Sequence, residues 1–258
     1  RQSFWVLERD CSMLAALACI DDPPEPAWVR LFTFKPLLSR SETWQALFEK
    51  VRQRLQADHL PFIAALPLYD WFEHLLYQSG FTQRQAIIGL EWCQKNTSSS
   101  KPEANFTIRP LLPQDLPYAH AVDCAAFDPL WRISIDTLTH AYHHSAYATV
   151  AEREGKVLGF QISTAKTASA HLARLAVQPG QQQRGVGTFL LHNMQEHFNR
   201  QGINDLTVNT QNDNEASIAL YQKLGYKQTG ERFPVMVYPI QADLAAAQKS
   251  LRQADTQR

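Results

Sequence analysis

The sequence lacks several features that would place it at once in a broad class. Its 258 residues carry 25 Lys and Arg against 25 Asp and Glu, so no excess of positive charge exists to hold nucleic acid or an anionic membrane. No apolar run reaches the roughly 18 residues of a membrane-spanning helix. The first residues, which mix charged and apolar side chains, do not read as a signal peptide. We therefore expect a cytoplasmic protein with neither a nucleic-acid nor a membrane partner.

Cysteine is also scarce, and its spacing excludes the common zinc motifs. No two cysteines form a C-x-x-C pair, and each has apolar neighbours, which is typical of reduced structural cysteines rather than disulfides. The four are Cys11, Cys19, Cys93 and Cys124. His140, His143 and His144 lie close together, but no carboxylate or further histidine completes a ligand set beside them. We expect no bound metal and interpret the histidines as a solvated helix end.

Glycine is sparse, yet two glycines lie one residue apart at a predicted turn between a strand and a helix. Residues 182–187 read Gln-Gln-Arg-Gly-Val-Gly, between an apolar run at 172–177 and a helical run at 188–199. Such a turn leaves successive backbone N–H groups uncovered where the helix dipole is positive. It predicts a site for phosphate or pyrophosphate, and hence a cofactor that carries a nucleotide.

Two familiar phosphate motifs do not fit this turn. A P-loop has four residues between its glycines and then Lys and Ser or Thr, whereas one residue separates Gly185 from Gly187 and Thr188 follows directly. A Rossmann motif needs a third glycine where Leu190 stands. An oxidoreductase that uses NAD or FAD is therefore disfavoured.

A second block of sequence narrows the interpretation. Residues 214–226 read N-E-A-S-I-A-L-Y-Q-K-L-G-Y, in which Asn214 can cap a helix and Gly225 can stop it before a strand. Together, the Q-x-x-G-x-G turn and this block, which looks like the family segment N-x-x-A-x-x-L-Y-x-x-L-G-F/Y with Ser217 in place of its alanine, resemble in order and spacing the GCN5-related N-acetyltransferase (GNAT) superfamily. The resemblance covers residues 106 to about 240.

The resemblance implies an α/β (α+β) protein with the GNAT fold, in which a mixed, mostly antiparallel sheet is flanked by helices. Periodicity and turn signals predict the order β-α-α-β-β-β-α-β-α-β-β in this part of the chain. The predicted strands are 106–112, 147–153, 157–164, 170–177 and 206–210, with a closing hairpin of 226–229 and 235–238. The predicted helices are 116–127, 135–143, 187–200 and 216–224.

The first part of the chain repeats this pattern. Residues 75–81 read L-L-Y-Q-S-G-F, and Gly80 precedes Gly225 by 145 positions. Predicted strands at 28–34 and 61–66, with a helix at 42–55, precede their counterparts by a similar distance. An internal duplication is the favoured interpretation. The alternative is an unrelated α/β domain that ends in a similar short segment.

We therefore predict four parts of the chain. They are a smaller, degenerate GNAT-like half (1–95), a polar, Ser-rich linker (96–105), a catalytic GNAT domain (106–240) and a helical or disordered tail (241–258). The first half lacks room for the opening strand and two helices. It also carries Glu42 and Trp44 where the glycines of the turn would be, so we expect it to bind no cofactor. Gly187→Trp should accordingly abolish cofactor binding and leave the fold intact.

For the second half, the resemblance implies acetyl-CoA as the cosubstrate. The pyrophosphate would lie on the amides of the turn, and the thioester near residues 173–175 of the preceding strand. The expected cofactor-binding residues are Leu175, Ala176, Val177, Gln182, Gln183, Arg184, Gly185, Val186, Gly187, Thr188, Asn214 and Tyr221. For Leu175 and Val177 the alternative role is core packing, and for Asn214 it is helix capping alone.

Tyr221 matches the family tyrosine that serves as general acid. A phenol titrates near ~10 and is protonated at neutral pH, so it can donate to a leaving thiolate, whose thiol titrates near ~8.5. The alternative is a buried core tyrosine. In many relatives a glutamate twelve residues earlier takes up the amine proton, but Asn209 stands there. This departure argues against the ribosomal-protein substrate of that subclass and leaves the base unassigned. Substitutes without a supporting motif are Glu152, His171, Glu231, Asp128 and ordered water.

Phe127, Asp128 and Trp131 follow the first predicted helix of the second half, in a region that shapes the acceptor pocket of the family. They could supply an apolar wall and a partner for an amine, or form only a helix-ending turn. The expected function is transfer of an acetyl group to a primary amine of a small molecule or peptide by direct attack. The alternative is a noncatalytic acyl-CoA sensor, and the sequence leaves open a monomer or a homodimer.

Overall fold

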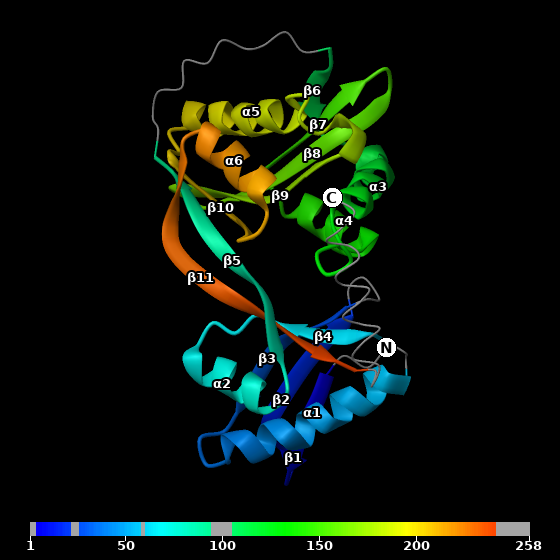
Figure 1. Ribbon diagram of the computed structural model, residues 1–258, viewed down its shortest axis with the longest axis vertical. Helices are drawn as coiled ribbons and strands as arrows, with labels where there is room; N and C mark the ends of the chain where they lie inside the picture. The colour runs from blue at the N-terminus through cyan, green and yellow to red at the C-terminus, as the bar shows by residue number, and fades with distance from the viewer. Residues whose placement is uncertain (1–3, 22–25, 58–59, 94–104, 241–258) are drawn as a thin grey trace. The chain divides into compact units, whose positions relative to one another are not determined.

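The computed structural model describes residues 4–21, 26–57, 60–93 and 105–240 (Figure 1). The chain forms two compact units, Arg1–Ala86 with Phe233–Arg258, and Ile87–Arg232. Both divisions fall within long strands, β5 (Thr82–Trp92) and β11 (Tyr226–Pro239). The predicted tail, and the predicted linker except Asn105, lie outside the described residues, and the predicted domain boundaries stay predictions.

The first unit contains one sheet and two helices. Its sheet has the order β1-β2-β3-β4-β11, in which only β3 and β4 pair in parallel. Trp44 of the first helix lies at the centre of the core, where its ring stacks on that of Phe48 with centroids 5.0 Å apart. The elements are β1 (Phe4–Arg9), β2 (Ser12–Asp21), β3 (Ala27–Phe34), α1 (Arg40–Ala57), β4 (Phe62–Ala65) and α2 (Asp70–Gln78).

The second unit contains the predicted mixed, mostly antiparallel sheet, with the order β5-β10-β9-β8-β7-β6. Only β9 and β10 pair in parallel. Its strands are β6 (Thr107–Pro110), β7 (Tyr147–Arg153), β8 (Lys156–Ala165), β9 (Ser169–Val177) and β10 (Asp205–Gln211). Its helices are α3 (Leu116–Ala126), α4 (Ile135–His143), α5 (Val186–Arg200) and α6 (Glu215–Lys223), with short 3₁₀ turns at Pro113–Asp115 and Pro179–Gln181.

Helices cover both faces of this second sheet (Figure 1). Val150 of β7 packs in one core cluster with residues of α3 and α4, whereas the next residue, Ala151, packs in another with Leu190 of α5. Consecutive side chains on a strand point to opposite faces. One face therefore carries α3 and α4, and the other carries α5. In a third cluster, Tyr221 of α6 packs with residues of α5, so its side chain lies on the face of the sheet that α5 covers.

The predicted closing hairpin is wrong, because β11 is a single strand of 14 residues. Residues 236–239 pair antiparallel with residues 62–65 of β4 in the first unit instead of folding back on residues 226–229. The common type I′ turn needs positive φ at two successive residues, and Gly230 (φ 89°) is the only residue of β11 that has it. The glycine bends the strand without reversing it.

Each unit follows the order β-β-β-α-β-α-β, in the second unit from β7 onward. Helices α2 and α6 each have nine residues, and each is followed by a glycine with φ 90°, Gly80 and Gly225. The described part of the first unit has no counterpart of β6, α3 and α4. This correspondence agrees in position with the predicted duplication.

Candidate functional site

The glycine turn presents uncovered amides to the start of α5. Gly185 caps the helix in the left-handed conformation (φ 84°), and Gln183 also has a positive φ of 59°. Within the described residues, none of the backbone N–H groups of residues 183–188 donates a hydrogen bond. Successive free donors at the positive end of a 15-residue helix can hold a diphosphate group.

The two glycines have different reasons to be glycine. Gly185 has a φ at which a side chain is strained. A Cβ atom on Gly187 would lie 3.2 Å from Leu220 Cδ2 of α6 and 3.7 Å from Val177 Cγ2 of β9. Helix α5 thus approaches its neighbours closely at Gly187. The expectation that Gly187→Trp would leave the fold intact is wrong, since an indole there would collide with the packing of α6.

Strand β9 separates from β10 just before the turn. Ile162 of β8 pairs with Arg174 and Ser163 pairs with Leu172, so Ala173 is the extra residue of a β-bulge. Pairing between β9 and β10 ends at Leu172 and Val208. Beyond that point, residues 174–177 pair in the described chain only with β8. The edge of β9 that faces away from β8 is therefore available to a ligand.

The predicted cofactor residues on β9 and the turn lie along one continuous path. Leu175 and Val177 pack toward α5, whereas Ala176 is buried on the face of α3 and α4. The side chain of Gln182 donates to the carbonyl of Val177 (3.2 Å), which ties the turn to the end of β9. The remaining residues of the path differ in exposure: Val186 is buried, Thr188 is half-buried and Arg184 is exposed. The Arg184 guanidinium forms no ion pair with any described residue.

Tyr221 is buried, with 5% of its surface exposed, and its ring lies 5.8 Å from that of Tyr226. No hydrogen bond engages its hydroxyl group within the described chain. Burial raises the pKa of the phenol above its usual range. The tyrosine is thus both a core residue and a protonated donor without a partner.

Asn214 caps α6, because its side-chain oxygen accepts a hydrogen bond from the backbone N–H of Ser217 (3.1 Å). Its amide nitrogen donates to Gln211 Oε1 (3.2 Å). The capping interpretation is confirmed. Contact of Asn214 with a cofactor stays a prediction.

The segment between α3 and α4 is held to β9 by Arg174. Its guanidinium group forms an ion pair with Asp123 (2.6 Å), donates to the carbonyl of Trp131 (2.7 Å) and lies 3.7 Å from the centre of the Phe127 ring. The Asp123 side chain is fully buried. The structure thus brings Phe127 and Trp131 together beside the bulge. The side chain of Asp128 accepts a hydrogen bond from the backbone N–H of Leu130 (2.9 Å).

Sequence reasoning missed Arg174 and Asp123. The only signal was a lone arginine within the apolar strand Leu172–Val177. A charged residue in such a strand requires a partner when it is buried. The partner, on a helix some 50 residues earlier in the sequence, could not be identified from spacing alone.

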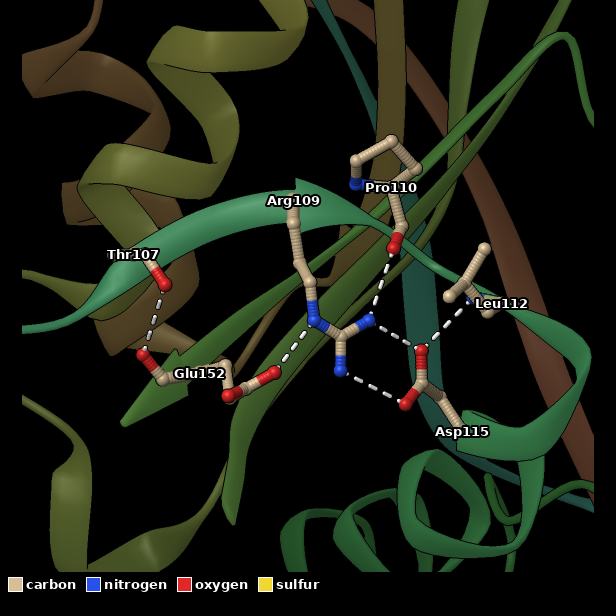
Figure 2. Close-up of polar contacts among 6 residues, drawn as sticks. All are labelled: Thr107, Arg109, Pro110, Leu112, Asp115 and Glu152. Carbon is tan, nitrogen blue, oxygen red and sulfur yellow. Dashed lines mark hydrogen bonds and ion pairs between the residues drawn. The ribbon is translucent and has the colours of Figure 1, made fainter. Parts of the chain in front are cut away.

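Glu152, one candidate base, is occupied by an ion pair. Figure 2 shows its carboxylate accepting from Arg109, whose guanidinium also makes a two-pronged contact with Asp115. Asp115 further accepts from the backbone N–H of Leu112 (2.9 Å). Arg109, together with this N–H group, lowers the pKa of Asp115, and the two carboxylates raise that of Arg109. This network fastens β6 to β7 and to the turn before α3.

Two other candidate bases, His171 and Glu231, have freer surroundings. The Nδ1 atom of His171 lies 2.8 Å from Thr207 Oγ1, and burial lowers the pKa of the imidazole. Glu231 is exposed, and its carboxylate accepts from Thr229 Oγ1 (3.4 Å). It forms no ion pair with any described residue.

Two further findings apply to the described residues. No group of three His, Cys, Asp or Glu side chains lies together where it could hold a metal ion. No described helix is both long enough and apolar enough to cross a membrane.

Comparisons with known proteins agree with this architecture. The acetyltransferase (GNAT) family model matches residues 116–226. The chain is 27% identical over 122 residues to the [ribosomal protein bS18]-alanine N-acetyltransferase of Escherichia coli K12. The matched segment covers 47% of this chain and 81% of that enzyme.

Two solved structures share the fold over most of the chain. A tandem GNAT protein from the clavulanic acid biosynthesis pathway has a TM-score of 0.64 at 17% identity, over 93% of this chain and 83% of that one. A GCN5-related N-acetyltransferase from Sphaerobacter thermophilus has a TM-score of 0.63 at 14% identity, over 90% and 78%. Residues 116–226 thus match the acetyltransferase (GNAT) family, and this match together with the bS18-alanine relative supports an acyl-CoA-dependent N-acetyltransferase.

Proposed function

We propose that the second unit transfers the acetyl group of acetyl-CoA to a primary amine of a small molecule or peptide by direct attack. The observation that carries this proposal is the run of uncovered amides at residues 183–188, next to the unpaired edge of β9. A pyrophosphate would bind the amides of the turn, and an extended amide-bearing arm would pair with the free edge of β9, which precedes the turn along the chain.

The turn supplies the binding energy for the charged part of the cosubstrate. An anion at a helix N-terminus gains ~0.3 to 1 kcal/mol, and up to ~2 kcal/mol when partly buried. Arg184 adds a charge-assisted contact to the phosphates. Along the arm, the edge of residues 174–177 that faces away from β8 offers hydrogen bonds of the kind that a neighbouring strand would make. Asn214 and Tyr221 border the same region from α6.

In this proposal Tyr221 protonates the leaving thiolate. Burial raises the pKa of its hydroxyl and keeps it protonated at neutral pH, and none of the described residues forms a hydrogen bond with it. A phenol that lost its proton to the thiolate in a buried site would recover it readily from solvent, because burial disfavours the phenolate. The acid is therefore ready for each turnover.

We also propose that the first unit is a degenerate GNAT-like half that binds no acetyl-CoA. Trp44 is fully buried in α1, and its indole N–H donates to Ser79 Oγ (2.7 Å). Phe32 and Phe72 pack edge-on against its ring. A cofactor near the start of α1 would have to displace part of this aromatic core.

The acceptor is an amine of either a small molecule or a peptide. The E. coli relative acetylates the alanine of ribosomal protein bS18. In this chain Asn209 stands where a glutamate is expected, and this difference argues against assigning the ribosomal substrate of that relative to this chain. Phe127 and Trp131, held by Arg174, form one side of the proposed acceptor site. We expect the protein to act in the cytoplasm as a monomer or homodimer.

The proposal is tested by following thiol release from acetyl-CoA, together with acetylated product, across a panel of amines. Tyr221→Phe should lower kcat by about 10²–10⁴-fold, because it removes the donated proton, and by calorimetry it should weaken acetyl-CoA binding far less than it slows turnover. Tight binding of acetyl-CoA without acetylation of any amine would instead favour a noncatalytic sensor, for which the missing glutamate at Asn209 leaves room.

A further inference from the structure

Asn209 has a carboxylate neighbour from another strand. On β10, Asn209 pairs with Gly89 of β5. A Cβ atom on Gly89 would lie 2.9 Å from Thr229 Oγ1, 3.1 Å from Glu231 Oε2 and 3.8 Å from Asn209 Oδ1. Because Gly89 has no side chain, the carboxylate of Glu231 occupies the space above it and comes close to Asn209.

This carboxylate lies on the face of the sheet opposite Tyr221. Val208 packs with Tyr221 in the cluster beneath α5 and α6. The next residue, Asn209, points to the other face, as does the space above Gly89 with which it pairs. Asn209 is also the first residue of β10 beyond the point where β9 and β10 separate. An acid and a base on opposite sides of that separation suit a reaction in which an amine enters from one side and a thiol leaves on the other.

The other candidate bases are engaged or less suitable. Glu152 is paired with Arg109, and Asp128 accepts from Leu130. His171 faces the same side as Asn209, but it lies on the paired part of β9 and is bound to Thr207. Burial lowers the pKa of this imidazole and thereby weakens it as a base. Glu231 alone among these groups is exposed and contacts only a hydroxyl group.

We propose that Glu231 replaces the carboxylate missing at Asn209 and accepts the proton of the acceptor ammonium, directly or through one water. The inference rests on the proposed acetyl transfer. The ammonium gives one proton to Glu231, and the neutral nitrogen attacks the thioester carbonyl to form a C–N bond. The C–S bond then breaks, and Tyr221 protonates the departing thiolate. The attacking nitrogen loses its second proton, which passes through water to the Tyr221 phenolate. Glu231 releases the first proton to water, so the step yields the amide, the free thiol and one proton.

Glu231 is held where this role requires it. Thr229 and Glu231 are two residues apart on β11, so both side chains reach the same face. The hydroxyl of Thr229 lies 3.4 Å from the carbonyl oxygen of Gly89 and the same distance from the Glu231 carboxylate. By strand alternation, the other described titratable groups on this face are Glu91 on β5, Asp205 on β10, His171 and Arg174 on β9, and Lys227 on β11, of which Arg174 is paired with Asp123.

The main test is Glu231→Gln in the full chain, with an amine that the wild type acetylates. We expect kcat/KM to fall by about 10²–10⁴-fold at neutral pH, and the loss to appear mainly in kcat. The deficit should shrink as pH rises toward the pKa of the free amine, because the nitrogen then arrives already neutral. Acetyl-CoA affinity by calorimetry should not change. Glu91→Gln, a carboxylate two residues from Gly89 on the same face, is the matched control and should retain activity.

Two further variants separate the proposed role from a structural one. Gly89→Ala keeps the carboxylate but places a methyl group 2.9 Å from Thr229 Oγ1 and 3.1 Å from Glu231 Oε2, so both side chains must shift and activity should fall, while circular dichroism checks that the fold persists. Asn209→Glu in the Glu231→Gln background restores a carboxylate at the neighbouring position and should recover at least tenfold of the lost activity.

Specific results would overturn the inference. If the wild type acetylates an amine and Glu231→Gln does so equally well at every pH, Glu231 is not the proton acceptor. The inference also fails if His171→Asn causes the pH-dependent loss while Glu231→Gln does not. If the wild type binds acetyl-CoA but acetylates nothing, it is the proposed function that fails, and the two failures are thereby distinguished.

Discussion

Gly185→Ala is the sharpest perturbation of the proposed phosphate turn. Gly185 has φ 84°, and a Cβ atom there would meet only ordinary contacts with the Phe189 ring at 3.7 Å. The cost is therefore backbone strain alone, about 1–2 kcal/mol for an L-residue in the left-handed conformation. If the turn relaxes to relieve this strain, the amides of residues 183–188 must be rearranged again whenever the ligand binds.

The strain then appears in one of two measurable quantities. A turn that keeps its shape lowers the free energy of unfolding by about 1–2 kcal/mol. A turn that relaxes weakens acetyl-CoA binding by about 5–30-fold, which is the same free energy. Urea unfolding gives the first quantity and titration calorimetry gives the second. We expect their combined loss to equal about 1–2 kcal/mol, with most of it in binding.

The chain offers two matched controls for this experiment. Gly180→Ala changes the preceding turn, where no heavy atom lies within 4 Å and φ is not positive, so it should alter neither quantity. Gly202→Ala introduces the same kind of strain (φ 77°) after the far end of α5, so it should lower stability and leave binding unchanged. Unchanged stability together with unchanged affinity in Gly185→Ala would refute the reasoning about the turn.

Further predictions concern the buried ion pairs. Asp123→Asn leaves Arg174, whose side chain is 16% exposed, without its counter-charge, so urea unfolding should show a loss of about 3–5 kcal/mol. A loss under about 1 kcal/mol would mean that the pair does not anchor the α3–α4 segment. The folded state lowers the pKa of Asp115, so its stabilising effect is present above the unfolded value near ~3.9 and fades as pH falls through the folded value. Asp115→Asn should therefore destabilise the protein by about 1–3 kcal/mol at neutral pH, and a deficit that persisted undiminished into strong acid would contradict the assignment.

The sequence predicted most of the second unit because its elements carry strong local signals. Two apolar runs joined by the turn Glu154-Gly155-Lys156 define β7 and β8, and capping residues at Asn214 and Gly225 define α6. The closing hairpin failed because a glycine within an extended segment can bend a strand as readily as reverse it. The choice depended on β4, which lies more than 160 residues away and pairs with the end of β11.

The candidate site, like the fold, could be predicted from the sequence only where short local motifs mark it. The glycine turn and Tyr221 lie within short motifs, so their neighbourhood could be inferred from spacing. Gly187 was assigned to phosphate approach, whereas the structure also requires it for packing against Leu220. Glu231 was one of several unranked bases, because its position beside Asn209 depends on a glycine in β5 that no local pattern connects with it.

Acetylation of an amine panel, measured for the wild type and Tyr221→Phe in parallel, tests the central claim most directly. The account predicts amine-dependent thiol release from acetyl-CoA, matched one for one by acetylated product. It also predicts that Tyr221→Phe still binds acetyl-CoA and turns over at least about 10²-fold more slowly. Full activity in Tyr221→Phe would contradict the assignment of the acid, and stoichiometric binding without product in the wild type would contradict the enzyme.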